Sequence, residues 1–258
     1  MSDCRIQYRR AFRYAPLDLH VARLRSGQNL MCEVDRILNL DLPAFEPINR
    51  RRGGWSGVAM VTCAGCKYFV KRQKNHSYRE PRRVFRRTPT LRREYRNTLR
   101  LQALRIPTPE IVQYRESDTG GFLITRQLHG FKNLEDYLIS VKNNFERTHT
   151  MTVVAQMLLT MHAAGLHHGC LYGKHVMVKP GVQPQAALID LETLRFTIRK
   201  LHNTAKDISQ LVRHTAGFNK DDAQIVSSTY ETYFPGFTTL LAEHLANLEK
   251  YSVHNVSD

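Results

Sequence analysis

Residues 166–178 read LHHGCLYGKHVMV, and residues 187–192 read ALIDLE. The first stretch follows a strongly apolar segment that predicts a helix ending at Gly165, and it runs into a short apolar strand. The second stretch is an apolar strand that leads directly into Asp190, twenty positions after Cys170. An acid directly after an apolar strand is placed as metal-binding aspartates are, so the two stretches together predict a loop site that carries chemistry.

The elements on either side of this loop differ in kind. Strand patterns lie mainly before it and helical patterns mainly after it, which predicts an α+β fold with two lobes rather than alternating βαβ units. The predicted strands are 58–62, 68–70, 110–114, 121–127, 176–178 and 187–189, and the predicted helices are 90–104, 133–141, 151–164, 204–215 and 223–248. We expect three parts: an N-terminal extension over 1–50 packed on the first lobe, a β-rich N-lobe over 51–128, and a helical C-lobe over 129–258.

The chain is strongly basic, with a formal net charge of +15 over 258 residues. Residues 71–105 hold 13 Lys or Arg against Glu80 and Glu94, a net of +11, so the rest of the chain contributes only +4. Such a cluster predicts an anionic partner, which is nucleic acid, an acidic membrane surface or a phosphorylated substrate. Nucleic acid is the weakest of the three, because the stretch has no recognised motif and its aromatic residues are few and widely spaced.

The cysteines and the N-terminal residues indicate a reducing compartment. The chain has five cysteines, an odd number at irregular spacing, and its first residues lack the apolar run of a signal peptide. No stretch approaches the length of about 18 apolar residues that a membrane span needs, so we expect a cytoplasmic protein whose membrane association is peripheral. Cys63 and Cys66 form a lone Cys-x-x-Cys without a second ligand pair for zinc, which favours a hairpin turn.

Three features before the loop fit a nucleotide site. Three glycines, Gly53, Gly54 and Gly57, let backbone N–H groups approach phosphate oxygens, although a plain hairpin turn has the same composition. Lys71 ends a predicted strand, where it either reaches a phosphate or lies on a basic surface. Glu94 is one of two acids in the basic stretch, so it pairs either with Lys71 or with a helical neighbour.

The loop itself carries a resemblance. Residues 168–175, HGCLYGKH, resemble the catalytic loop H-x-D-x-x-x-x-N/H of kinase-like phosphotransferases. Four neighbouring segments sharpen the match: 93–97, 106–109, 188–192 and 206–211. Over about residues 50–215 the chain resembles the Kdo/WaaP lipopolysaccharide core kinase family and, within it, the InaA-like branch. The resemblance implies a protein-kinase-like fold that phosphorylates sugars of the lipopolysaccharide inner core at the cytoplasmic membrane face, using ATP and Mg²⁺.

The resemblance also implies which residues bind the nucleotide. Lys71 would contact the ATP phosphates, and Glu94 would hold Lys71 in place. Arg126, Gln127 and Leu128 would form the hinge whose backbone meets the adenine. The glycine-rich segment would cover the phosphates.

The remaining implied roles lie in and around the loop. Asp190 would bind Mg²⁺, and His175 would take the place of the metal-binding Asn. Asp207 would brace the catalytic loop as a structural acid. The position of the catalytic aspartate, however, holds Cys170, whose thiol accepts hydrogen bonds poorly and forms little thiolate at neutral pH.

Three interpretations follow from Cys170. The chain is an active kinase in which the Cys170 thiolate, His168 or Glu192 orients the acceptor hydroxyl. Alternatively, it is a pseudokinase that binds nucleotide or glycolipid and regulates the envelope or a stress response. The third is a different transfer reaction on the same fold. In the first two, the basic stretch 71–105 would meet a phosphorylated lipid A–core glycolipid or an anionic membrane surface.

Overall fold

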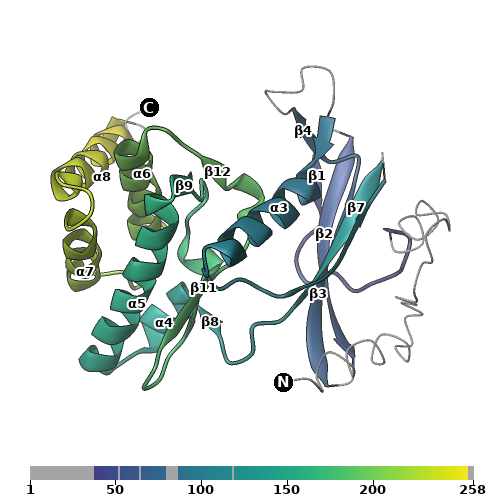
Figure 1. Ribbon diagram of the computed structural model, residues 1–258, viewed down its shortest axis with the longest axis horizontal. Coiled ribbons are helices and arrows are strands. Elements are labelled where there is room, and N and C mark those ends of the chain that lie inside the picture. The colour runs from purple at the N-terminus through teal and green to yellow at the C-terminus, as the bar shows by residue number, and fades with distance from the viewer. Residues whose placement is uncertain (1–37, 52, 64, 80–86, 118, 255–258) are drawn as a thin grey trace. The chain divides into compact units, whose positions relative to one another are not determined.

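The computed structural model describes residues 38–51, 53–63, 65–79, 87–117 and 119–254. Most of the predicted N-terminal extension, residues 1–37, therefore lies outside the described residues. The chain divides into two compact units. The sheet unit comprises Met1–Tyr95 and Pro109–Gln127, and the helical unit comprises Arg96–Thr108 and Leu128–Asp258. Strands dominate the first unit and helices the second, so the predicted α+β class is confirmed (Figure 1).

The sheet unit is built on a five-stranded antiparallel sheet with the strand order β1-β2-β3-β7-β6. Its strands are β1 Asn49–Arg51, β2 Gly54–Cys63, β3 Cys66–Lys74, β6 Ile111–Glu116 and β7 Gly120–Arg126. A second ladder pairs β4 Ser77–Arg79 with β5 Arg87–Pro89. Figure 1 shows β2, β3 and β7 side by side, and β3 is hydrogen-bonded along both edges. Residues on β3 are therefore held on two sides.

Side chains alternate between the two faces of this sheet. Tyr68 and Val70 of β3 pack with Phe122 and Ile124 of β7 in the buried cluster of the unit. Lys71 directly follows Val70 and so points to the opposite face of β3. The strand therefore uses one face for the core and offers the other to polar chemistry.

The Cys-x-x-Cys segment joins β2 to β3 by a tight turn. Cys63 pairs directly with Cys66 across the hairpin, and Gly65 has a φ of +74°, which favours glycine. Neither Cys63 nor Cys66 forms a disulfide within the part of the chain that the structure describes. The predicted hairpin turn is confirmed.

The glycine-rich segment divides between a turn and a strand. Gly53 lies between β1 and β2 with a φ of +77°, whereas Gly54 and Gly57 lie within β2, which begins earlier than the sequence predicts. A Cβ on Gly54 would come 2.5 Å from the carbonyl oxygen of Asn75. Close backbone packing therefore requires glycine at position 54.

Most of the helical unit follows the hinge. Its helices are the second part of α3 Thr90–Ala103, α4 Leu134–Ser140, α5 Asn144–Ala163, α6 Lys200–Arg213, α7 Lys220–Glu231 and α8 Phe237–His254. Its short strands are β8 Lys132–Asn133, β9 Leu166–His167, β10 Val176–Lys179, β11 Gln185–Leu188 and β12 Arg195–Phe196, with 3₁₀ turns η1 Gly173–His175 and η2 Leu191–Thr193. β8, β10 and β11 form one antiparallel sheet, and β9 pairs with β12. None of the described helices is long and apolar enough to span a bilayer.

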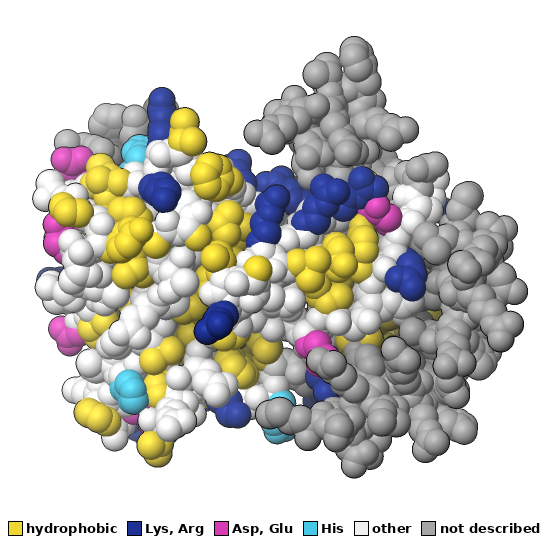
Figure 2. Space-filling view, in the orientation of Figure 1, with side chains coloured by type: hydrophobic (Ala, Val, Ile, Leu, Met, Phe, Trp, Pro, Cys, Tyr) yellow, Lys and Arg dark blue, Asp and Glu magenta, His cyan; other side chains and the backbone are white. Residues whose placement is uncertain are grey.

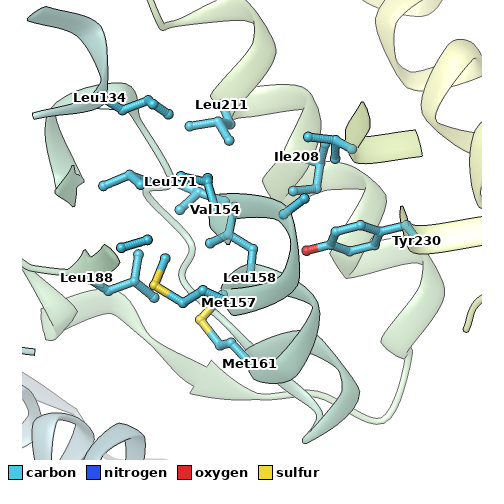
Figure 3. Packing of buried hydrophobic residues seen from close by; sticks show 14 of the residues in the cluster. Leu134, Val154, Met157, Leu158, Met161, Leu171, Leu188, Ile208, Leu211 and Tyr230 are labelled. Atoms are coloured by element: carbon cyan, nitrogen blue, oxygen red, sulfur yellow. The ribbon is translucent and has the colours of Figure 1, made fainter. Parts of the chain in front are cut away.

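Helix α5 is the centre of the helical core. Figure 3 shows Val154 and Leu158 of α5 with Ile208 and Tyr230 on one side and Leu188 on the other. All five side chains are fully buried. A helix that is apolar around most of its circumference must be covered by neighbours on every side, and α5 packs on α6, α7 and β11. The loop that follows α5 is thus attached to the helix at the centre of the core.

A buried ion pair joins α5 to α7. Arg147 donates from Nε to Asp222 Oδ1 at 3.0 Å and from its other nitrogens to Asp222 and to the carbonyls of Leu138 and Gly217. Asp222 is fully buried and also accepts the N–H of Asn219 as part of a capping box. The hydrogen bonds that Arg147 donates to Asp222 raise the pKa of Arg147, so the guanidinium stays charged. One guanidinium therefore connects the ends of three helices.

Candidate functional site

The predicted lysine–glutamate pair is formed in the sheet unit. Lys71 Nζ lies 2.6 Å from Glu94 Oε2, and both side chains are largely buried. Lys71 lies in the middle of β3, opposite Val58 of β2 and Leu123 of β7, and not at the strand end as the sequence predicts. The strand continues to Lys74. The ammonium group is therefore held by a backbone that is fixed on both sides.

Gln73, two residues along the same face of β3, fixes the start of α3. Its Oε1 accepts hydrogen bonds from the Thr90 hydroxyl at 2.6 Å and from the Leu91 N–H at 3.0 Å. Its side chain is 1% exposed. An N-terminal N–H of the helix, which has no partner within the helix, is thus satisfied by the strand that carries Lys71. The distance between Lys71 and Glu94 follows from this connection.

Two further contacts tie the first turns of α3 to β6. Arg92 forms an ion pair with Glu116, and the rings of Tyr95 and Tyr114 stack with centroids 4.3 Å apart. Burial and the hydrogen bond to Glu116 raise the pKa of Tyr114, so its phenol stays protonated. Glu94 lies between these anchored residues, so its position over the sheet is set before any ligand binds.

The predicted hinge residues have partly engaged backbones. The Gln127 N–H donates to the Lys67 carbonyl and the Arg126 N–H to the Glu110 carbonyl, each at 2.9 Å. Leu128 belongs to the helical unit, where its carbonyl accepts the Phe131 N–H. Adenine recognition by the hinge stays a prediction, and it would have to use other backbone groups than these N–H donors.

In the helical unit, Asp207 of α6 braces the loop after β9. Its carboxylate accepts the backbone N–H groups of His168 and Gly169, and His162 Nε2 donates to it at 3.3 Å. Burial alone would raise the pKa of Asp207, but these hydrogen bonds, together with His167, hold it well below its usual range. The geometry matches the structural role expected for Asp207.

His168 is fully buried beneath the loop and contacts it through its ring. Its Nε2 lies 3.1 Å from the carbonyl oxygen of Ile189, and its ring stacks on His175 with centroids 5.7 Å apart. Burial lowers the pKa of His168 and favours the neutral imidazole. The ring of His168 therefore supports the loop from its buried side, and the orienting role that the sequence leaves open for it stays a prediction.

His175 and Asp190 meet as a possible metal-ligand pair. His175 Nδ1 lies 2.7 Å from the Cys170 carbonyl, and its Nε2 lies 3.6 Å from Asp190 Oδ2. Carboxylate oxygens of Asp190 and Glu192 lie within 4.8 Å of one another. Asp190 has a φ of +55°, a left-handed conformation that turns its side chain at the end of the apolar strand. Two carboxylates at this spacing repel each other unless a cation or donor lies between them.

Asn97 of α3 is a residue that the sequence reasoning did not single out. Its Nδ2 donates to the carbonyls of Leu191 and Leu194, both at 2.8 Å, and so fixes the turn that follows Asp190. Asn97 is 1% exposed in a helix with many Arg residues. A single Asn on the apolar side of such a helix is the signal by which it can be found.

The arrangement matches known proteins at the level of family. The model of the lipopolysaccharide kinase (Kdo/WaaP) family matches residues 35–230. The chain belongs to this family. Protein InaA of Escherichia coli (strain K12) is 30% identical over 193 residues, which cover 72% of this chain and 89% of InaA. A co-crystal structure of WbdD and the kinase inhibitor LY294002 is similar with a TM-score of 0.45 and 16% identity, and the match covers 78% of this chain but only 46% of the WbdD chain.

Membership of the Kdo/WaaP family confirms the predicted resemblance and sharpens the question of Cys170. The thiol of Cys170 is partly exposed and free. The loop around it keeps the conformation set by Asp207 and His175. The replacement thus changes one side chain at the expected aspartate position and leaves the surrounding backbone ordered.

The basic stretch of this Kdo/WaaP family member is only partly a basic surface. Arg72 is directed inward, where it donates to the Leu40 carbonyl and lies 5.7 Å over the Trp55 ring. Arg96 and Arg100 are exposed on α3, and Figure 2 shows Lys and Arg side chains gathered over this helix. Residues 80–86 lie outside the described residues. Binding of phosphates by the stretch stays a prediction.

Proposed function

We propose that the chain is an ATP-dependent kinase of lipopolysaccharide core sugars, acting on a hydroxyl of a heptose- or Kdo-type residue in cell-envelope biogenesis. The ion pair between Lys71 and Glu94 carries the proposal. In kinases this pair must be in place for the lysine to hold the ATP phosphates. Here three independent contacts of α3 with the sheet hold Glu94 in reach of Lys71.

The donor set of the helical unit fits a divalent cation. Asp190 and Glu192 supply carboxylate oxygens, and His175 supplies a ring nitrogen whose tautomer is set by the Cys170 carbonyl. Bound Mg²⁺ would neutralise the phosphate oxygens of ATP. The residues themselves are held by Asp207 and Asn97, so the loop and the acid are preorganised within one unit.

The acceptor hydroxyl would be oriented by Cys170 or Glu192. A general base contributes about 10²- to 10⁴-fold in rate, whereas positioning and electrostatics supply most of the catalysis of phosphoryl transfer. Loss of the aspartate therefore predicts a slow kinase rather than an inert one. The acceptor is proposed to be a phosphorylated core glycolipid at the cytoplasmic face of the inner membrane, and the high positive charge supports an anionic partner.

One observation favours a second candidate. Cys170 lies at the position expected for the aspartate, while the Lys71–Glu94 pair proposed to hold the nucleotide is formed. The same site would therefore suit a pseudokinase, which would bind nucleotide or glycolipid and regulate an envelope or stress response. Transfer of labelled γ-phosphate to core glycolipid separates the two functions. We expect transfer by the native chain, and nucleotide binding without transfer would support the pseudokinase instead.

The site assignment has its own test. ATP with Mg²⁺ should raise the melting temperature, and Asp190→Asn should abolish both this metal dependence and transfer. Asp221→Asn, an exposed acid of α7, is the matched control. Cys170→Asp should raise the transfer rate by about 10²-fold or more. If Asp190→Asn leaves transfer intact, the assignment is wrong.

A further inference from the structure

A second feature of the helical unit lies outside the loop site. Residues 195–200, called here the docking segment, run from β12 into the first residue of α6. Phe196 and Ile198 are 63% and 88% exposed, although both are large apolar side chains. Exposed apolar residues this close together on an ordered segment mark an interaction site.

The docking segment is held in shape by its polar residues. The Thr197 N–H donates to the Gly165 carbonyl at 2.8 Å, and its hydroxyl oxygen accepts the Arg199 N–H at 3.1 Å. Asn203 of α6 donates to the same hydroxyl. Phe196 pairs with Leu166 across the β9–β12 ladder. Phe196 and Ile198 are therefore presented to solvent by a hydrogen-bonded backbone on either side of an anchored threonine.

The charged side chains of the docking segment are all positive. Arg195, Arg199 and Lys200 are exposed in the segment itself, and the exposed face of α6 adds Lys206 and Arg213. Between Leu194 and Gly217 the sole acid is Asp207, which is buried and fully engaged with the loop. Helix α8, which packs on α6, carries the exposed acid Glu243 next to His244.

The second part of α3 is joined to the residue that precedes the docking segment. Arg100 donates to Asn97 Oδ1 at 3.0 Å, and Asn97 donates to the Leu194 carbonyl at the start of the docking segment. Leu99 is 43% exposed beside Arg100. Figure 2 shows hydrophobic side chains standing beside Lys and Arg side chains on this face of the unit, over β12 and α6. Two elements thus combine exposed apolar groups with cations.

We propose that residues 195–200 form a membrane-docking segment that inserts Phe196 and Ile198 into an anionic bilayer surface. Isolated protruding apolar side chains need no matching groove when they enter the acyl boundary, and the surrounding cations meet anionic headgroups. A soluble polyanion would gain from the cations but not from Phe196 and Ile198. The choice of a bilayer as the partner rests on the proposed function, which includes a glycolipid substrate. The exposed apolar and basic residues of the segment are observed independently of that function.

The test is co-sedimentation of the full chain with vesicles of phosphatidylcholine, with and without phosphatidylglycerol, in the absence of nucleotide. We expect binding only to the anionic vesicles. The double variant Phe196→Ser/Ile198→Ser should weaken partitioning by about tenfold or more, and Arg199→Glu/Lys200→Glu by a similar factor. Val182→Ser, which changes an apolar residue 94% exposed in the turn between β10 and β11, is the matched control and should bind like the native chain.

Each other outcome overturns the proposal. These are equal binding to neutral vesicles, no binding by the native chain, or unchanged binding by the double serine variant. Loss of binding in the charge variant alone would indicate a purely electrostatic surface for a soluble polyanion. Thermal shift with ATP, measured on the same variants without vesicles, reports folding and the nucleotide site separately. If the native chain binds ATP but not anionic vesicles, the membrane-docking proposal is wrong and the kinase proposal is unaffected.

Discussion

The side chain of His175 is tied to the backbone of Cys170, with Nδ1 2.7 Å from the carbonyl oxygen. Because a carbonyl only accepts, Nδ1 is the donor in this contact, and Nε2 is the ring nitrogen that faces Asp190. Cys170, which lies at the position expected for a catalytic aspartate, thus positions the proposed metal ligand His175 through its main chain.

His175→Asn should change the preferred metal. Imidazole suits Mn²⁺ better than Mg²⁺, which prefers oxygen ligands. We expect the ratio of apparent affinities for Mn²⁺ over Mg²⁺ to fall by about tenfold, measured as metal-dependent thermal stabilisation with ATP present. His149→Asn, at an exposed position of α5, should leave the ratio unchanged. The same ratio in His175→Asn and the native chain would contradict a metal-binding role.

Asp207 should make the helical unit sensitive to acid. Its pKa in the folded state lies below the ordinary value of about 3.9, so its contribution to stability is present above that pH and is lost as pH falls toward the folded-state pKa. Asp207→Asn should lower the free energy of unfolding at pH 7 by about 3 kcal/mol and flatten its fall below about pH 5. Urea unfolding followed by circular dichroism at several pH values measures both effects. Asp221→Asn should change neither.

Breaking the ion pair between Arg147 and Asp222 should be costly. Asp222 is fully buried, so Arg147→Ala leaves an unpaired buried carboxylate and should destabilise the chain by about 3–5 kcal/mol. Glu110→Ala breaks a pair with Arg126 in which Glu110 is 58% exposed, and should cost less than about 1 kcal/mol. Chemical denaturation of both variants compares them. Equal losses would show that the Arg147 pair is not the connection between helices described above.

Gln73→Met should weaken nucleotide binding indirectly, because Gln73 contacts the start of α3 and is not proposed to contact the nucleotide. The change leaves the Leu91 N–H without its acceptor, at about 1–3 kcal/mol, and reduces the partners of the Thr90 hydroxyl to His76, so the start of α3 that positions Glu94 is less firmly held. ATP affinity should fall while Lys71 and Glu94 are unaltered. Gln102→Met, at an exposed position of the same helix, is the control. Lower stability with full ATP affinity would mean that Gln73 holds the helix but does not position Glu94.

Much of the site could be predicted because it is encoded locally. Lys71 and Asp190 each follow a short apolar strand, and the loop over 167–175 lies between an apolar helix and an apolar strand. Hydrophobic periodicity therefore locates all three. The predicted strand over 68–70 is shorter than β3, which runs from Cys66 to Lys74. The second half of β3 is polar on both faces, so the sequence shows no alternation of apolar and polar residues there. Arg72 resembles a surface residue, yet the Leu40 carbonyl and the Trp55 ring hold it inside.

Other features depend on contacts that sequence spacing does not reveal. α5 begins at Asn144 because the Asn143 side chain accepts the N–H groups of Phe145 and Glu146, although the first turns carry no apolar pattern. The predicted helix over 223–248 is two helices, α7 and α8, separated around Pro235. The partners of Arg147 lie far away in sequence, so its role appears only once α5 and α7 are packed.

The hydrogen bonds that Asp207 accepts from the loop backbone bear on substitutions at position 170. Asp207 holds the N–H groups of His168 and Gly169, while His175 holds the carbonyl of Cys170, so the side chain at position 170 bears no part of the backbone's support. An exchange of that side chain therefore leaves the backbone contacts of the loop in place. Under the proposed function, a single substitution at position 170 would change the rate of phosphoryl transfer without refolding the loop.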